Sequence, residues 1–213
     1  MIARILAALA GLSLVAPAQA ALPTERNALL DMIQRHFTQV RTMTANFVQT
    51  GPDGRQMRGA MTLARPGKVR FQYEPTVPFL VVADGRQVSL VDYEVAQVQR
   101  YPIRETPLAS LLGSADGLRQ YAQTIRVADQ SGIEILTVEA QDKRRPEYGR
   151  LTLYFQDAPG APAGLLPIGW TVVDNQGQTT QVQLTGVKFN PAVSDGAFRY
   201  RDPRGAGVGP RGR

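Results

Sequence analysis

Residues 57–73 read MRGAMTLARPGKVRFQY, and the polarity of their side chains alternates with a period of two. The positions on one side of this alternation are apolar, aromatic or small: Met57, Gly59, Met61, Leu63, Val69, Phe71 and Tyr73. The sequence Arg65-Pro66-Gly67 between the two halves is typical of a turn. Because successive side chains of a β-strand point to opposite faces, the stretch predicts two antiparallel strands that share one apolar face.

Similar turn signals recur about every eight to twelve residues and separate about eleven strand-like runs. They include Gly51-Pro52-Asp53-Gly54, Glu74-Pro75, Asp84-Gly85, Asp157 to Gly160 and Asn175-Gln176-Gly177. This spacing favours an antiparallel meander over alternating strand and helix units. We therefore expect a mainly β protein with short helices, whose sheet is open or closed on itself.

Two stretches have helical patterns instead. The first follows Pro23 and Thr24, which suit the entry and the N-cap of a helix. Its apolar residues at helical spacing are Leu29, Leu30, Ile33, Phe37 and Val40. The second stretch, residues 106–121, predicts two short helices, because Pro107 suits a first helical turn and Gly113 suits an exit.

The composition excludes much catalytic and metal-site chemistry. The chain has 213 residues, of which 43% are hydrophobic, and it has a net charge of +6, one histidine and no cysteine. Without cysteine there is no disulfide, thiol nucleophile or thiolate zinc site, and one histidine severely limits triad chemistry. We expect one domain, residues 21–200, without metal or cofactor, followed by a disordered basic tail at residues 201–213.

Residues 1–20 have the parts of a secretory signal peptide. A short basic start precedes the apolar run Ile5–Val15 and the small-residue sequence Ala18-Gln19-Ala20. A transmembrane anchor is disfavoured because the run would span only about 16 Å, roughly half of a hydrocarbon core. We expect cleavage after this sequence and, since the next residue is Ala21 and not cysteine, export without a lipid anchor of the protein's own.

The three predicted helices are too few and too short to cover the whole apolar face of such a sheet. Two outcomes follow. Either the sheet curls around the helices into a fully packed core, or it leaves a hydrophobic cavity beneath a movable lid. Composition does not decide between them.

Arg65 stands out because it has the same strand parity as Met61 and Leu63. If the strand continues to Pro66, the guanidinium points to the apolar side. A buried cation needs hydrogen-bond acceptors, and the bare carbonyls at the end of a short helix are suitable ones. The alternative is that Arg65 lies in the turn and points to water.

No group of residues predicts an enzyme. His36 lies on the N-terminal helix, where it could face solvent or the helix edge. The acidic pairs Asp92 with Glu94 and Glu139 with Asp142 could flank a glycosidic bond, but their places at strand ends favour solvated turns. Glycine-rich phosphate-binding motifs are absent from the sequence.

The basic residues gather in two places: Lys143-Arg144-Arg145, and a C-terminal set of Arg199, Arg201, Arg204, Arg211 and Arg213. Such clusters could attract a polyanion or an acidic membrane surface. Their positions in a hairpin and a tail favour simple solvation. Because no nucleic-acid-binding fold is recognisable, we expect no nucleic-acid partner.

Several short motifs follow one another along nearly the whole expected mature chain. They are Phe47-Val48-Gln49, Gly59, Arg65-Pro66-Gly67, Val82-Ala83-Asp84-Gly85, Thr106-Pro107-Leu108, Leu111-Leu112, Leu166-Pro167-Ile168, Trp170, Val187-Lys188-Phe189 and Phe198. In their order, spacing and exported context the chain resembles the periplasmic outer-membrane lipoprotein carrier family, LolA. The resemblance implies an incomplete β-barrel with a lid of short helices over a hydrophobic cavity.

The resemblance also implies roles for single residues. In such carriers the arginine of the Arg-Pro strand end hydrogen-bonds the lid backbone in the closed form, and here that arginine is Arg65, with Leu111 and Leu112 as the matching lid positions. Further lid residues would be Pro107, Leu108 and Leu118. The expected cavity lining is Phe47, Met61, Leu63, Val69, Phe71 and Trp170. The family often has aromatic residues after the arginine, where this chain has Val69 and Phe71.

The function implied is that of a non-enzymatic, monomeric carrier in the periplasm. It would bind the acyl chains of triacylated lipoproteins released from the inner membrane by an ATP-binding-cassette complex, and deliver them to an outer-membrane receptor or to the membrane itself. Two alternatives stay open. One is a lipid-binding or envelope-stress sensor module of related fold, although such regulators usually have a second domain. The other is an enzyme acting on envelope lipid or glycan, for which acid, base and nucleophile are lacking.

Overall fold

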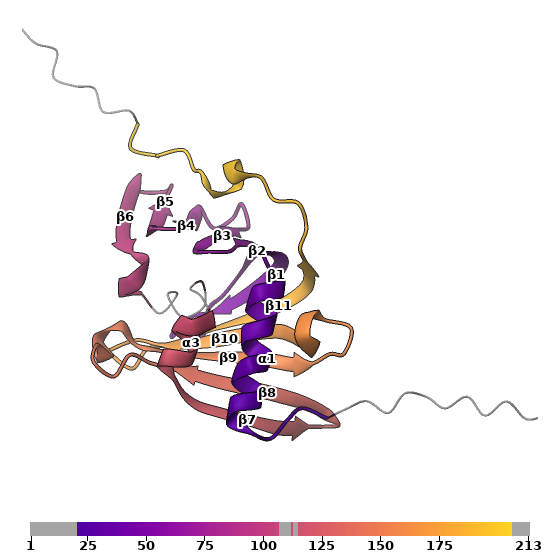
Figure 1. Cartoon of the computed structure of the whole chain (residues 1–213). Coiled ribbons are helices and arrows are strands. Elements are labelled where there is room, and N and C mark those ends of the chain that lie inside the picture. The colour runs from indigo at the N-terminus through magenta and orange to yellow at the C-terminus, as the bar shows by residue number, and fades with distance from the viewer. Residues whose placement is uncertain (1–20, 107–111, 113–114, 206–213) are drawn as a thin grey trace, which may run out of the picture.

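One antiparallel sheet of eleven strands forms the centre of the computed structural model, which describes residues 21–106, 112 and 115–205 (Figure 1). The strand order is β6-β5-β4-β3-β2-β1-β11-β10-β9-β8-β7. The strands are β1 (Thr42–Thr50), β2 (Gln56–Ala64), β3 (Lys68–Tyr73), β4 (Phe79–Asp84), β5 (Gln87–Asp92), β6 (Gln97–Pro102), β7 (Ala122–Gln130), β8 (Ile133–Ala140), β9 (Arg150–Asp157), β10 (Leu165–Val173) and β11 (Thr179–Phe189). The predicted mainly β class is confirmed.

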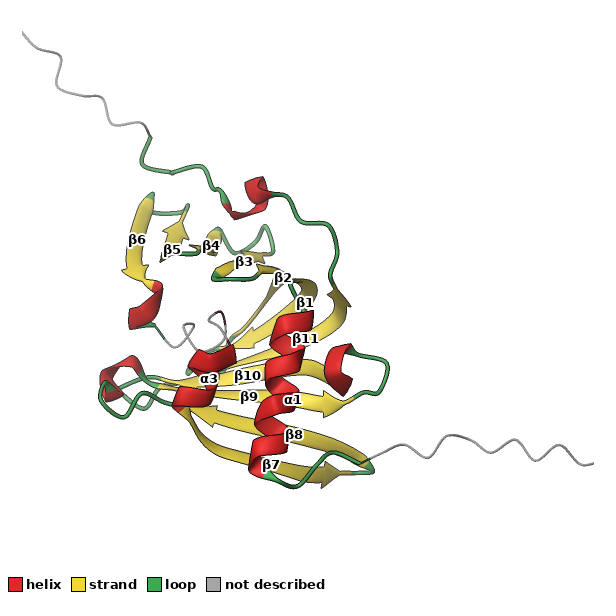
Figure 2. Ribbon diagram, viewed as in Figure 1, coloured by secondary structure: helices red, strands yellow, loops and turns green. Residues whose placement is uncertain are grey.

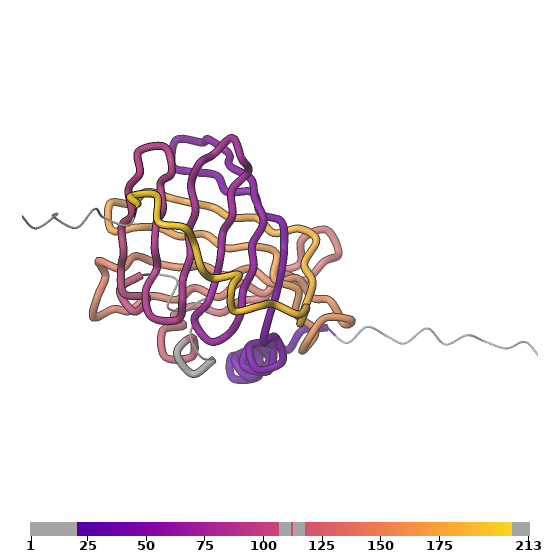
Figure 3. The backbone as a smooth tube through the Cα atoms, turned by 90° about the horizontal axis from the view of Figure 1, so that it is seen from above, coloured from indigo at the N-terminus to yellow at the C-terminus, as the bar shows by residue number. Residues whose placement is uncertain are grey.

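The sheet consists of two meanders, β1–β6 and β7–β11, whose first and last strands pair with each other. The pairing of β1 with β11 runs from Met43 opposite Phe189 to Thr50 opposite Gln181. The edges are β6 and β7, which do not pair with each other, so the sheet stays open. Seen from above, the first meander lies over the second (Figure 3). The expected incomplete barrel is thus confirmed.

The stretch at residues 57–73 forms β2 and β3, paired from Gly59 opposite Tyr73 to Ala64 opposite Lys68. Gly59 is needed for close packing. A Cβ atom at this position would lie 2.2 Å from the carbonyl oxygen of Gln72 and 2.8 Å from the ring of Phe47. Because glycine has no side chain, the ring of Phe47 can pack directly against the backbone of this strand, in space that any other residue would occupy.

Two helices, α1 (Arg26–Gln39) and α3 (Ala115–Tyr121), pack against each other beside the second meander (Figure 2). The side of α1 that carries Leu29, Ile33 and Phe37 is buried in the core. The residue before the helix is Glu25 and not Thr24, so the predicted N-cap is wrong by one position. None of the described helices is long and apolar enough to cross a membrane.

Four short 3₁₀ helices complete the described elements: η1 (Ile103–Glu105), η2 (Pro146–Tyr148), η3 (Pro162–Gly164) and η4 (Asp195–Phe198). Of the two short helices predicted within residues 106–121, α3 is the second. Leu112 is helical, but the rest of the first lies outside the described residues.

The C-terminal segment from residue 191 to 205 covers the outer face of the first meander. Phe198 packs there against Leu80, Val82 and Val91. The guanidinium of Arg70 donates to the carbonyl oxygens of Ala197 and Arg199, at 3.3 and 2.9 Å. Outward-facing positions of β4 and β5 are therefore buried as well as inward-facing ones.

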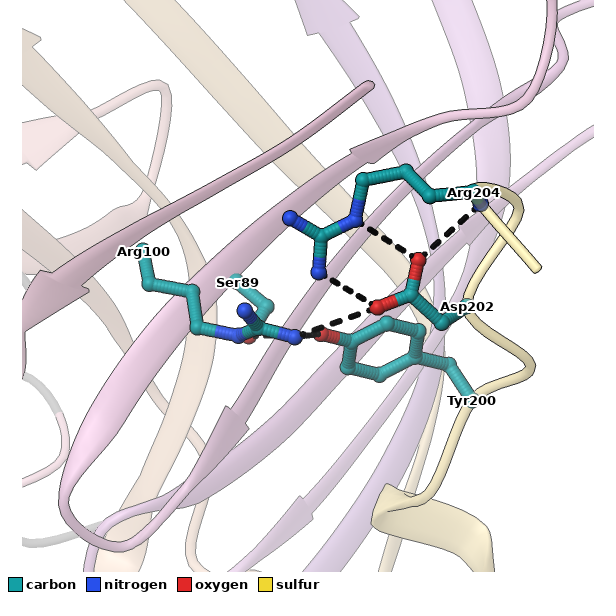
Figure 4. A network of polar contacts seen from close by, with 5 residues as sticks. All are labelled: Ser89, Arg100, Tyr200, Asp202 and Arg204. Carbon is teal, nitrogen blue, oxygen red and sulfur yellow. Dashed lines mark hydrogen bonds and ion pairs between the residues drawn. The ribbon is translucent and has the colours of Figure 1, made fainter. Parts of the chain in front are cut away.

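A polar network fastens the end of this segment (Figure 4). Arg100 of β6 donates to the hydroxyl of Tyr200 at 2.8 Å and to the carboxylate of Asp202 at 3.4 Å. Asp202 also accepts hydrogen bonds from Arg204, and the Tyr200 hydroxyl lies 3.4 Å from the hydroxyl of Ser89. The part of the expected disordered tail at residues 201–205 thus has a defined position, while residues 206–213 lie outside the described chain.

Candidate functional site

The residues expected in a cavity lining lie together in one apolar core. They are Phe47, Met61, Leu63, Val69, Phe71 and Trp170, all buried. The three aromatic rings among them meet edge to face, with 5.5 Å between the centroids of Phe47 and Phe71 and 5.8 Å between those of Phe71 and Trp170. The two meanders therefore share one continuous apolar interior.

Part of this interior is a hollow of about 420 Å³, bordered by β1, β3–β6, β10 and β11. Its lining is Gln49, Phe71, Tyr73, Val81, Val88, Leu90, Tyr101, Thr106, Trp170, Val172, Thr180 and Val182. A largely apolar lining with a few polar groups is typical of sites for apolar ligands. Of the residues predicted to line a cavity, Phe71 and Trp170 border this hollow.

A second, much smaller cavity of about 30 Å³ lies between α1 and the sheet. Met61, Leu63 and Trp170 border it together with His36, Phe37 and Arg65, among others. It has room for about one or two water molecules. The interior next to α1 is therefore nearly filled, whereas the interior next to β5 and β6 is not.

The predicted lid residues that the structure describes, Leu112 and Leu118, point into this interior. Their exposed fractions are 0% and 1%, and both belong to the same core as the sheet residues. The backbone N–H of Gly67, in the turn after β2, donates to the carbonyl oxygen of Leu112 at 3.0 Å. The other predicted lid residues, Pro107, Leu108 and Leu111, lie outside the described residues. Leu112 and Leu118 thus fill part of the interior, and the turn after β2 binds the backbone at Leu112.

A polar contact connects α3 to α1. Arg119 of α3 forms an ion pair with Asp31 of α1, and its guanidinium also donates to the side-chain oxygen of Gln34 at 3.4 Å. Both charged side chains are partly exposed, at 39% and 53%. The contact is therefore open to solvent screening.

Arg65 lies in the turn after β2, and yet its side chain enters the interior. Its Cζ lies 3.9 Å from the centroid of the Phe37 ring, and its backbone N–H donates to the carbonyl oxygen of Arg41 at 2.7 Å. Burial lowers the pKa of Arg65 to about 10, so the side chain stays positively charged at neutral pH. The expected inward orientation is confirmed, although the strand ends at Ala64 and does not continue to Pro66. The alternative is right that Arg65 lies in the turn and wrong that it points to water.

His36 is buried, with an exposed fraction of 2%, so its expected place at a solvent-facing or edge position is wrong. Nδ1 donates to the carbonyl oxygen of Pro162 at 2.9 Å, and the ring meets the edges of Phe155 and Phe189. Burial lowers the pKa of His36 to about 4, and the nearby charge of Arg65 adds to this effect. At neutral pH the imidazole is therefore a neutral core residue next to a cation.

A polar pair inside the hollow was missed in the sequence. The hydroxyl of Tyr73 donates to the side-chain oxygen of Gln49 at 2.7 Å, and burial raises the pKa of Tyr73 to about 12. The shared parity of Gln49 with Phe47 on β1 is the signal that could have placed its amide inside. The pair satisfies two polar groups that would otherwise be costly in an apolar lining.

The acidic pairs lie in turns or at strand ends. Asp92 accepts the backbone N–H groups of Glu94 and Val95, Glu139 pairs with Arg150 at 3.7 Å, and Asp142 accepts the N–H of Arg144. The described residues contain no cluster of three or more metal-ligating side chains. The predicted hairpin position of Lys143-Arg144-Arg145, between β8 and β9, is confirmed.

One family model matches the part of the chain that contains the sheet, the turn at Arg65 and the segment between β6 and β7. A sequence model described as "Outer membrane lipoprotein carrier protein LolA" matches residues 38–201. The chain belongs to the LolA family. The matched residues include all eleven strands of the described sheet. The match begins at residue 38, so most of α1 precedes the matched part.

Known relatives of this LolA-family chain extend over most of its length. A protein of Nitrosospira multiformis is 32% identical over 178 residues, which is 79% of this chain and 82% of that protein. A protein of Bordetella avium is 29% identical over 187 residues, or 84% and 85% of the two chains. Both have the name outer-membrane lipoprotein carrier protein.

A crystal structure of an uncharacterized conserved protein from Thermus thermophilus is similar in fold. It superposes with a TM-score of 0.50 at 11% identity, over 82% of this chain and 94% of that one. At such low identity the likeness concerns the fold alone.

Proposed function

We propose that this LolA-family chain is a non-enzymatic carrier that holds the acyl chains of lipoproteins in its hollow during their transfer to the outer membrane. The observation that carries the proposal is the coexistence of an apolar hollow of about 420 Å³ with lid leucines, Leu112 and Leu118, buried in the same interior. The names of the relatives support lipoproteins as the cargo.

The cost of exposing acyl chains to water explains why such a carrier is needed. Each methylene removed from water contributes about 0.8 kcal/mol, so a sixteen-carbon chain represents about 12 kcal/mol. A lipoprotein therefore does not cross an aqueous compartment unaided at a useful rate. An interior lined by Phe71, Leu90 and Trp170 offers an apolar surface in place of water.

Release requires that the empty, closed state is itself favourable. In the closed state Leu112 and Leu118 occupy the interior and the Gly67 N–H binds the lid backbone. Acyl chains would displace these leucines, and Arg65, with Leu111 and Leu112 as its lid partners, would restore the closed form when cargo leaves. Hydrogen bonds to a charged donor contribute about 1.5 to 3 kcal/mol each, which sets the size of this restoring effect.

The proposed route lies in the periplasm. The expected signal peptide supports export, and an inner-membrane ATP-binding-cassette complex would supply the energy to load the carrier against its favoured closed state. The receiver would be an outer-membrane receptor or the outer membrane itself. Pro107, Leu108 and Leu118 would move with the lid, and Phe47, Met61, Leu63 and Val69 would border the space vacated.

Binding of a synthetic tripalmitoylated lipopeptide by the purified mature protein tests the function. We expect a soluble complex with the lipopeptide and none with the same peptide lacking acyl chains. Val172→Glu puts a charge into the lining of the hollow and should reduce the affinity at least tenfold, because a charge in an apolar site is costly. The matched control is Val95→Glu, at a position 64% exposed. Equal binding by both variants, or equal binding of the unacylated peptide, would refute the proposal.

A further inference from the structure

The guanidinium of Arg65 has an aromatic ring directly beneath it. Its Cζ lies 3.9 Å from the ring centroid of Phe37, which is itself buried in α1. This distance is well within the range of a cation–π contact, in which the negative face of the ring attracts the cation. Because the contact with the ring uses the face of the guanidinium, it does not compete with hydrogen bonds that the N–H groups make at the side.

The backbone on either side of this cation is bound to two different parts of the molecule. The N–H of Arg65 donates to Arg41, just after α1, and the N–H of Gly67 donates to the lid residue Leu112. The turn therefore links the chain just after α1 to the lid through backbone contacts two residues apart. A side chain on α1 that fixes Arg65 also fixes the turn that binds the lid.

We infer that Phe37 is a positioning residue for the lid: its ring holds the Arg65 guanidinium inside the barrel and thereby stabilises the closed state. The inference rests on the proposed function for its biological meaning, but the coupling between Phe37, Arg65 and the lid is measurable without cargo. An aliphatic residue at position 37 would fill space without attracting the cation.

The Gly67 amide gives a direct readout of the lid, because its proton is donated to Leu112. Hydrogen exchange of this amide, followed by NMR, should become about tenfold faster in Phe37→Leu, a loss of about 1.4 kcal/mol. Phe37→Tyr retains the ring and should restore most of the protection. Phe155→Leu is the matched control, since Phe155 borders the same cavity and contacts His36 without stacking on Arg65.

The single histidine gives a second, independent readout. The charge of Arg65 helps to lower the pKa of His36, together with burial. If Phe37→Leu lets the guanidinium leave, the pKa of His36 should rise, and it should rise by a similar amount in Arg65→Leu. A structural loss of packing alone would not make these two variants equivalent.

A double-mutant cycle decides the inference. In the Arg65→Leu background, Phe37→Leu should cause little further acceleration of Gly67 exchange, because the contact is already gone. Additive effects of the two substitutions, or acceleration by Phe155→Leu as large as that by Phe37→Leu, would overturn it. If the lipopeptide is not bound while the cycle shows coupling, the proposed function fails and this inference stands.

Discussion

Arg65 brings a charge into an apolar interior from a position in a turn, and its proposed part in cargo release can be tested by removing that charge. Arg65→Leu removes the charged donor and should favour the open lid, so that cargo is retained. We expect the transfer of bound tripalmitoylated lipopeptide to acceptor vesicles to slow by about tenfold or more, the size of one hydrogen bond to a charged group. Arg58→Leu, on the exposed face of the preceding strand, is the matched control. Release at the wild-type rate would remove Arg65 from the mechanism.

His36 makes the stability of the protein depend on pH. The folded protein protonates it only near pH 4, whereas the unfolded chain does so near the ordinary value of 6.5. The unfolded chain therefore binds more protons between these values, and the free energy of unfolding falls as the pH drops from about 6.5 to about 4. The expected loss from this residue is about 3 kcal/mol.

Urea unfolding at pH 7, 5.5 and 4.5 measures this dependence. His36→Gln can still donate to the carbonyl oxygen of Pro162 but does not titrate. The difference in pH slope between the two proteins isolates the imidazole from the carboxylates. Parallel slopes would show that the imidazole is not buried as described.

At the scale of the elements, α3 is held to α1 by the partly exposed pair of Asp31 and Arg119, and this makes a modest, salt-dependent prediction. Because the chain has no cysteine, Leu118→Cys introduces a unique thiol on the buried side of α3. Adding Asp31→Asn should increase its labelling rate about two- to threefold at low salt, since exposed pairs contribute about 0.2 to 1 kcal/mol.

High salt should bring the parent protein to the same labelling rate, because it screens the pair. Asp53→Asn breaks an exposed pair in the β1–β2 turn and serves as the control. A labelling rate that is unaffected by Asp31→Asn would mean that apolar packing alone keeps α3 in place.

The elements themselves were predictable where the pattern is local. The alternation at residues 57–73 and the regular turn signals sufficed for the strands of both meanders, since strand periodicity is a property of neighbouring residues. The burial of Leu80, Val82 and Val91 on the outer face was not predictable, because it depends on Phe198, more than a hundred positions along the chain. The N-cap of α1 was missed by one residue for lack of a side-chain cap.

The same division holds for the candidate site. Strand parity favoured an inward position for the aromatic residues and left Arg65 open between the interior and solvent. It gave no information on which element would lie beneath the guanidinium. Helical spacing predicts only that Phe37 is one apolar residue of a helix and that His36 faces either solvent or the helix edge. Both acquire their roles from the packing of α1 against the sheet, which no short-range pattern encodes.

At the scale of the whole molecule, the topology relates the proposed lid segment to the two edges of the sheet. The edge strands β6 and β7 are consecutive in sequence, and the segment between them contains Leu112 and α3. The proposed lid thus lies, in sequence, between the two strands of the described sheet that do not pair with each other.

The lack of pairing between the edge strands β6 and β7 also affects the diameter of the incomplete barrel. A closed barrel can widen only if the backbone hydrogen bonds between two of its strands break. In an open sheet the two edge strands can move apart while every pair of neighbouring strands stays hydrogen-bonded. We therefore expect the sheet to widen for larger acyl chains while all of its strand pairs stay intact.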